Sequence, residues 1–487
     1  MFQVSGIARL ASVPAYFGFK IASAILLLKV CASYLTVSGY GEFAQLVQFG
    51  TVLNLLAVGG AQNGLIRQSA AAGDDEQLAG IHGAALIIWI GAALLLLVPL
   101  CLASKLVSSV LVGNPRAWPT VIAITALSLA AGPGQIWCSI LSGRRRVATS
   151  LVAQGSGLFV GTATATLFIV LGQAHAAATA FAAGSLLTLI VAGRAVAPHR
   201  LKVGTRAAAL AQVMPLIRYS AALAATSGYT ALVLFGLRSF YRDQFGATAL
   251  GYWIAANRIS DLSNQLLGLF MIQFYVSHVT GLDDPLERRR FILRCWAAAT
   301  ALMGTALLVF SLAGRALVSL FLSDAFLPAV PIIQAYLLGD VLTVWASLAM
   351  YTAFARGKPG RYAAIEMGTV SVMAVIAVAL MASGNPRAPQ LAYVSAYAVT
   401  ALNPKSIIFF IAFVPQFIDT ARPFAPQVAI LEATFVIMAG LNAALYGWLA
   451  SKAREKLKNP RVQRAVNRTG GSALMGAGVL ALGWRNS

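Results

Sequence analysis

The feature that most constrains this chain is a series of about a dozen apolar segments, each roughly 20 residues long, between residues 1 and 400. A bilayer core is about 30 Å thick and a helix rises about 1.5 Å per residue, so about 20 apolar residues cross it. Because backbone groups in lipid must hydrogen-bond to one another, such segments form helices. The sequence therefore predicts an all-α polytopic membrane protein. Six segments are long enough to span alone: 80–104, 117–141, 147–172, 291–314, 327–353 and 361–383.

The composition agrees with this class and excludes several others. Hydrophobic residues make up 59% of the chain and charged residues 10%, far below the quarter expected of a soluble domain. The net charge of +21 is concentrated in short loops between apolar segments, so we expect it to set topology and not to bind nucleic acid. The four cysteines and four histidines form no ligand cluster, and no nucleotide-binding or hydrolase motif is present. We expect neither enzyme activity, nor a metal, nor a cofactor.

The loops between the apolar segments predict the orientation of the chain. Even-numbered loops are rich in Arg and Lys, as in Arg144–Arg146 and Arg288–Arg290, whereas odd-numbered loops hold few. The positive-inside rule then places the amino terminus in the cytoplasm. The twelve expected helices lie at about 13–35, 41–66, 80–104, 117–141, 147–172, 175–196, 212–238, 248–276, 291–314, 327–353, 361–383 and from 389 onward.

A long basic loop at 193–206 divides the first 400 residues into two halves of six helices. We therefore expect domains at 1–200 and 207–398, followed by a third segment at 399–487. A faint repeat at an offset of 210 residues supports the division. It aligns Gly41 with Gly251, Gln48 with Arg258, and Asn54 with Asn264. Two six-helix halves around a central cavity are a recurring transporter plan.

Two lysines lie within the first apolar segment, where a charge is costly and indicates function. Lys20 and Lys29 are nine residues apart, so on a straight helix they point to opposite faces and stand about 13.5 Å apart. Lys20 has a simpler explanation, because a long side chain near a helix end can reach the interface. Lys29 lies deeper, and we expect its loss to impair function more.

Four further ionisable residues lie at membrane depth. Arg258 and Asp261 are three apart and share a helix face, either as site residues or as a self-neutralising pair. Asp340 has no basic residue within four positions and is the better candidate for a proton or cation site. Glu366 follows Arg361 by five residues, so pairing with the loop is an alternative to a role in ion coupling. We predict ion-coupling roles for Asp261, Asp340 and Glu366.

The second expected helix ends in GGAQNGLIRQ, which places Gln62, Asn63 and Arg67 together at its predicted cytoplasmic end. The glycines permit either a helix break or close packing, and the amides offer donors and acceptors. A packing motif is the alternative to a binding site here. Several cations among the candidates for a cavity favour an anionic substrate over an apolar one.

Five short segments follow one another in an order found in a known family: KIASAILLLK (20–29), GGAQNGLIR (59–67), ANRISD (256–261), LLGDVLTV (337–344) and AIEM (364–367). Through these five segments, residues 1 to about 398 resemble the Wzx-type polysaccharide and lipid III flippases of the multidrug/oligosaccharidyl-lipid/polysaccharide exporter superfamily. The resemblance implies a V-shaped pair of six-helix bundles in the bacterial inner membrane. It also implies that the chain moves an undecaprenyl-diphosphate-linked glycan. Because no nucleotide-binding loop is present, we expect an ion gradient, the membrane potential or the substrate gradient to drive transport, with a proton or sodium gradient favoured. We expect a monomer, with polymerase and chain-length machinery as partners.

Such a head group needs cations for its diphosphate and amides or aromatic faces for its sugars. The candidate substrate-binding residues are Lys20, Lys29, Gln62, Asn63, Arg67, Arg238, Trp253, Asn257 and Arg258.

The last part of the chain departs from this family. The spacing LNPK-x4-FF-x4-PQF within 400–427, and RVQRAVNRTGGSALMGAGVLAL at 461–482, resemble the carboxy-terminal half of the LysE/RhtB amino-acid exporters. This fragment would add two to three helices. We place the junction at about 398–402 and interpret it as a fusion or truncation scar. Amino-acid efflux through this fragment, or a nonfunctional fusion product, are the alternatives to glycan flipping.

The tail also poses a topological conflict. If 389–418 is one helix, the basic loop 452–468 lies outside the cell, against the rule that the earlier loops obey. If 403–420 breaks at a proline and re-enters, the loop returns to the cytoplasm. We favour the re-entrant arrangement.

Overall fold

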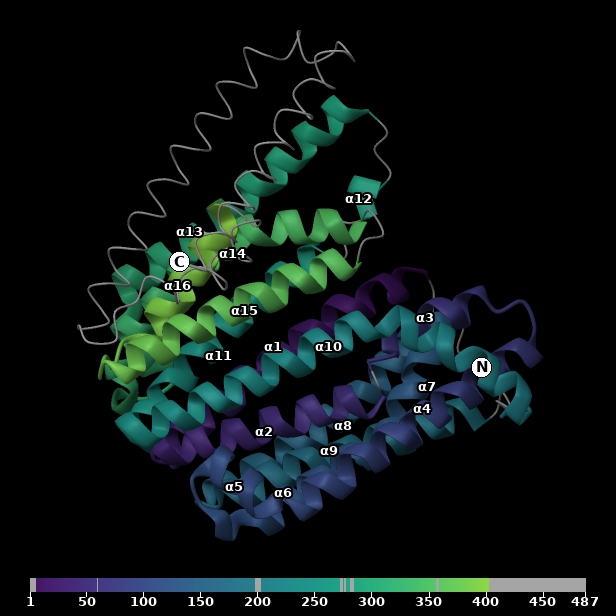
Figure 1. Ribbon diagram of the computed structural model, residues 1–487, viewed down its shortest axis with the longest axis horizontal. Coiled ribbons are helices and arrows are strands. Elements are labelled where there is room, and N and C mark those ends of the chain that lie inside the picture. The colour runs from purple at the N-terminus through teal and green to yellow at the C-terminus, as the bar shows by residue number, and fades with distance from the viewer. Residues whose placement is uncertain are drawn as a thin grey trace, which may run out of the picture. The chain divides into compact units, whose positions relative to one another are not determined.

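The computed structural model describes residues 6–58, 60–197, 203–271, 275, 277–280, 284–355 and 359–402. The chain divides into two compact units, 1–416 and 417–487, and every described residue belongs to the first. Within these ranges the chain forms helices and no strand (Figure 1). Eight helical stretches of this part are long and apolar enough to cross a membrane, which confirms the all-α polytopic membrane fold.

Two helices of the first half begin at a side chain that caps them. Thr36 caps α2 by accepting a hydrogen bond from the Gly39 N–H, and Asp74 caps α4 by accepting one from the Gln77 N–H. The helices are α1 (Gly6–Tyr34), α2 (Val37–Ala57), α3 (Gln62–Ala71), α4 (Asp75–Leu102), α5 (Ser104–Val112), α6 (Trp118–Ala130), α7 (Gly132–Gly143), α8 (Val147–Val170) and α9 (Ala174–Val196).

Two expected helices are broken. The predicted helix 41–66 ends at Ala57, and Gly60 then takes a φ of 67°, a left-handed conformation that favours glycine. The chain restarts as α3, so Gln62 and Arg67 lie on a separate short helix. The predicted helix 117–141 is likewise interrupted at Ala131, just before Pro133, which cannot donate a backbone hydrogen bond to the preceding turn.

Two helices of the second half, α10 and α13, are longer than the apolar pattern predicts. The sequence predicts a helix at 212–238, whereas the corresponding α10 has 40 residues and is about 60 Å long. The sequence likewise predicts a helix at 291–314, whereas the corresponding α13 has 37 residues. The helices are α10 (Arg206–Phe245), α11 (Ala247–Phe270), α12 (Ser277–Thr280), α13 (Pro285–Phe321), α14 (Val330–Ala355), α15 (Pro359–Ala382) and α16 (Ala388–Leu402), with a 3-10 helix, η4 (Asp324–Ala329), before α14.

The two halves meet along three helices. In the first half α8 packs against α9 and α1, and in the second α14 packs against α13 and α16. Between them α2 packs against α11, while α10 contacts α4 of the first half and α15 of the second (Figure 1). Leu216 of α10 is buried with Val58 and Leu65 in a core of the first half. The long α10 thus ties both halves together beside the α2–α11 contact.

Candidate functional site

A cavity of about 410 Å³ lies between the two halves, and α1, α2 and α11 supply most of its wall. Its charged lining residues are three cations, Lys20, Arg238 and Arg258, and one carboxylate, Asp261. Lys20 and Arg258 are exposed, whereas Asp261 is half-buried. The cavity therefore carries a net positive charge at membrane depth. Such a site favours an anionic ligand, because a low dielectric strengthens charge–charge attraction.

Arg238 holds the wall of the cavity together across the two halves. This side chain of α10 is 2% exposed and donates to Gln48 Oε1 of α2 at 2.8 Å and to Asn257 Oδ1 of α11 at 2.7 Å. Asn257 in turn donates to Asp261 Oδ1 at 3.3 Å. The guanidinium lies 5.9 Å from the ring centroid of Trp253, within range of a cation–π interaction. Arg238 thus joins an amide of each half.

Asp340 lies at the centre of a second polar cluster, inside the second half. The side chain is fully buried, and its Oδ1 accepts hydrogen bonds from Ser260, Asn264 and Tyr393, at 2.7, 2.8 and 2.7 Å. Its other oxygen, Oδ2, has no hydrogen-bond partner among the described residues. A buried carboxylate with one oxygen unsatisfied is a site where a proton or a small cation is favourable.

Aromatic side chains lie between these two clusters. The Trp253 indole donates to the Tyr336 hydroxyl at 2.6 Å. The Tyr336 ring stacks on that of Tyr393, with centroids 4.4 Å apart. Since Trp253 contacts Arg238 and Tyr393 contacts Asp340, continuous buried packing joins the cavity wall to the carboxylate.

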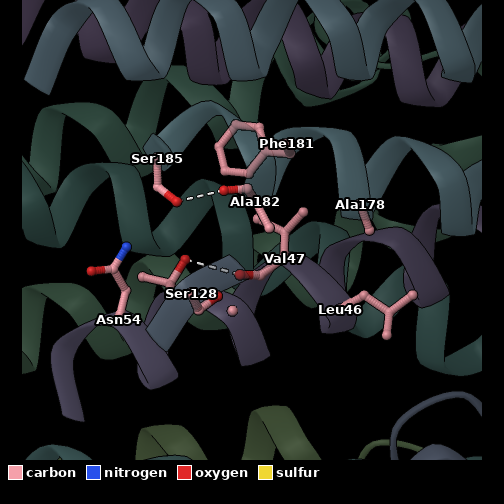
Figure 2. Close-up of a pocket in the computed structure, with 10 residues that line it drawn as sticks. Leu46, Val47, Asn54, Ser128, Ala178, Phe181, Ala182 and Ser185 are labelled. Atoms are coloured by element: carbon pink, nitrogen blue, oxygen red, sulfur yellow. Dashed lines mark hydrogen bonds between the residues drawn. The ribbon is translucent and has the colours of Figure 1, made fainter. Parts of the chain in front are cut away.

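A smaller pocket of about 70 Å³ opens beside the cavity, inside the first half (Figure 2). Val47, Thr51 and Phe181 line both spaces, so the pocket adjoins the cavity wall. α2, α6 and α9 form the pocket. Its ten lining residues are Leu46, Val47, Gly50, Thr51, Asn54, Ser128, Ala178, Phe181, Ala182 and Ser185.

At one end of the cavity, where α2 and α11 begin, the two halves touch directly; we call this the joined end. A Cβ added to Gly41 would lie 3.3 Å from the Cα of Gly251, and one added to Gly251 would lie 2.2 Å from the carbonyl oxygen of Val37. Phe326 of η4 is fully buried and packs edge-on against Tyr40 and Tyr252. The two glycines that the repeat aligned therefore meet at the contact between the halves.

Two basic side chains strengthen the joined end by capping helices across it. Lys29 donates from Nζ to the carbonyl oxygens of Ser319 and Leu322, at 3.2 and 2.8 Å, at the end of α13. Arg242 donates to those of Ser109 and Val110, at 2.9 and 3.0 Å, at the end of α5. The last carbonyls of a helix lack intrahelical partners and carry partial negative charge, so cations stabilise them.

The structure brings some of the predicted site residues to the cavity and places others elsewhere. Lys20, Arg238, Arg258 and Asp261 line it, and Asn257 braces its wall. Lys29 does not line the cavity, because its amine is bound at the end of α13. The remaining members lie outside the lining: Gln62 and Arg67 on α3, Trp253 behind Arg238, Asp340 in its own cluster, and half-buried Glu366 on α15. The side chain of Asn63 lies outside the described residues.

Sequence reasoning missed the partners that complete these clusters. Gln48 and Asn264 appear only as members of the faint repeat, and neither Ser260 nor Tyr393 is singled out. Their signal is weak, because one neutral polar residue on an apolar helix is common at helix contacts. Only the positions of their partners on other helices give them a role.

Comparison with known proteins confirms both resemblances. Over 386 residues the chain is 22% identical to the lipid III flippase of Escherichia coli (strain K12), covering 78% of this chain and 92% of that protein. Residues 386–483 match the family described as LysE type translocator. The match begins before the junction predicted at about 398–402. Over 89 residues the chain is 34% identical to the homoserine/homoserine lactone efflux protein of Salmonella typhi. The chain spans about two fifths of the length of the curated relatives of this second kind.

The fold is that of a solved flippase. The lipid II flippase MurJ in an inward closed conformation matches 90% of this chain and 99% of its own, with a TM-score of 0.65 and 14% sequence identity. The chain is therefore a lipid III flippase homologue over most of its length, with a LysE-type segment at its carboxyl end.

Proposed function

We propose that this protein moves an undecaprenyl-diphosphate-linked oligosaccharide from the cytoplasmic to the periplasmic leaflet of a bacterial inner membrane. The cationic cavity between the two halves is the observation that carries the proposal. It is supported by the similarity to a lipid III flippase over most of the chain. Polymerase and chain-length machinery would take the product at the periplasmic face.

The diphosphate is the part of the substrate that the cavity suits best. Lys20 and Arg258 face the cavity, and the described residues give Arg258 no ion-pair partner. An arginine offers a planar fork of donors that matches phosphate oxygens, and a lysine adds a compact charge. The polyprenyl tail remains in the bilayer, so its apolar surface is never transferred into the polar cavity.

Alternation of access would require the joined end to separate. With the amino terminus in the cytoplasm, this end faces the periplasm, so the cavity receives substrate from the cytoplasmic side. Opening then breaks the contacts of Gly41, Gly251 and Phe326 and releases Lys29 from α13. Those contacts involve few residues at one end of the cavity, which suits an interface that is broken in every transport cycle.

Asp340 is the proposed coupling residue, for a proton or a sodium ion. Its free Oδ2 accepts the ion, and packing through Tyr393, Tyr336 and Trp253 lies between it and Arg238. An ion bound at Asp340 neutralises a fully buried charge, which changes the energy of the α11–α14–α16 contact. Asp261 and Glu366 are the further candidates for coupling.

Reconstituted vesicles test the function directly. Purified protein in liposomes should move a fluorescent undecaprenyl-diphosphate-linked saccharide between leaflets. Arg258→Gln and Lys20→Gln should each slow this transfer at least tenfold by loss of diphosphate binding. Arg315→Gln, an exposed arginine of α13 that does not line the cavity, is the matched control. Equal rates in all three variants would refute a diphosphate site in this cavity.

The carboxy-terminal segment favours a second candidate, amino-acid efflux. Residues 386–483 match the translocator family, but the chain spans only about two fifths of such relatives. Complementation separates the candidates: growth of a flippase-null strain with residues 1–487 supports glycan transfer. Homoserine resistance without complementation supports efflux. The absence of both phenotypes indicates a nonfunctional fusion product. A chain whose twelfth helix is restored to the flippase sequence is the positive control.

A further inference from the structure

The pocket in Figure 2 contains polar groups with nothing to bind. Ser128 is 2% exposed and lines the pocket, and Asn54 is half-buried beside it; neither side chain hydrogen-bonds to another described residue. Nearby Thr125 of the same helix instead satisfies its hydroxyl on the carbonyl of Val121 at 2.7 Å. A buried hydroxyl without a hydrogen-bond partner is unfavourable unless a ligand or a water molecule binds it.

In the second half, the protein's own side chains occupy the position equivalent to this pocket. The 210-residue repeat aligns Asn54 with Asn264, and α2, α6 and α9 correspond in order to α11, α14 and α16. In the second half Asn264 donates to Asp340 at 2.8 Å, and Tyr393 fills the space between α14 and α16. In the first half no carboxylate lines the pocket, and the small residues Ala178 and Ala182 leave it open. The amide is kept but its internal partner is missing.

The size and lining of the pocket restrict its occupant. Its volume of about 70 Å³ is several times the roughly 10–15 Å³ that one water molecule needs, so it takes a group of a few heavy atoms. None of its lining residues is charged, so an ion is not compensated there. Leu46, Val47 and Phe181 offer apolar contact beside the polar groups of Asn54 and Ser128. A small group with one polar and one apolar side fits this wall.

We propose that this pocket is a specificity site for the acetamido substituent of an amino sugar in the transported head group. The proposal rests on the glycan-flipping function and names one feature of its substrate. The substituent's carbonyl accepts from Ser128 or the Asn54 amide, its N–H donates to the Asn54 carbonyl oxygen, and its methyl group contacts Val47 and Phe181. A sugar with a plain hydroxyl at the same carbon leaves these groups unsatisfied and the pocket partly empty.

The test compares two lipids that differ only in this substituent: polyprenyl-diphosphate-linked N-acetylglucosamine and polyprenyl-diphosphate-linked glucose. Leaflet transfer of each is measured in liposomes containing the purified full chain. The wild-type protein should move the acetamido lipid about tenfold faster, the effect of one hydrogen bond and a buried methyl group. Ala182→Leu fills the pocket and should reduce this ratio to about one. Ser128→Ala keeps the volume and should reduce the ratio roughly threefold.

Ala126→Leu, on the exposed face of α6, is the matched control and should leave both rates and their ratio unchanged. If the wild-type protein moves both lipids equally, or if Ala182→Leu and Ser128→Ala keep the tenfold ratio, the specificity site is refuted while glycan flipping stands. If neither lipid is moved by the wild-type protein, both the function and the site are refuted. Loss of selectivity in both variants, with the control intact, supports the assignment.

Discussion

Replacing Gly251 by alanine should force the joined end apart. A Cβ at this position would lie 2.2 Å from the Val37 carbonyl oxygen and 2.8 Å from its carbon, where about 3.3 Å is the usual limit. The contact must therefore widen by about 1 Å, against the backbone of α2, which cannot rotate away as a flexible side chain would. Overpacking of this kind costs about 1–3 kcal/mol.

That cost applies only while the halves touch, so it changes the balance between joined and separated states. The gain in helix propensity from Gly to Ala, about 0.5–1 kcal/mol, is the same in both states and cancels. A difference of about 1–3 kcal/mol shifts the population toward separation by about 5- to 150-fold. Transport should fall, because return to the joined state becomes the unfavourable step.

Distances between spin labels measure this shift. Labels at Ser33 and Ala325 lie on exposed positions of the first and second halves at the joined end, after the four native cysteines are replaced. Gly251→Ala should add a longer distance population. Gly236→Ala and Gly304→Ala, where no atom lies within 4 Å of the added Cβ, are the controls and should not. A distribution for Gly251→Ala identical to the wild type would show that this contact does not govern separation.

Three further predictions follow from the same structure. Lys29→Ala removes the cap on α13 and should lengthen the Ser33–Ala325 distance without weakening lipid binding, whereas Lys20→Ala should weaken binding. A binding defect in Lys29→Ala would return Lys29 to the substrate site. Tyr393→Phe removes one of three hydrogen-bond donors to Asp340, so we expect a loss of about 1–3 kcal/mol in stability. The ion dependence of transport in liposomes should also change. An unchanged ion dependence would argue against coupling at Asp340. For the tail, a single cysteine at Ser451, outside the described residues, should be shielded from a membrane-impermeant thiol reagent in intact cells, and labelling would reject the re-entrant arrangement.

The sequence determines the helices of this protein because membrane insertion depends on local composition. Twenty apolar residues form a helix in lipid whatever their neighbours, and the expected segments at 147–172 and 175–196 agree closely with α8 (Val147–Val170) and α9 (Ala174–Val196). The likeness of α2 and α11 is likewise present in the sequence, as an aligned pair of glycines.

The tertiary structure decided what the polar residues do. Lys29 has a fitting charge and depth for the cavity, but its partners are the carbonyls of a helix some 290 residues later in the chain. Arg238 was a candidate from its charge, but its bridging of Gln48 and Asn257 depends on three helices meeting. A hydrogen bond requires a partner within about 3 Å, and helical periodicity fixes only the face of a residue's own helix. Which helix lies opposite that face is settled by packing between the halves, and it is there that the cavity, the joined end and the side pocket arise.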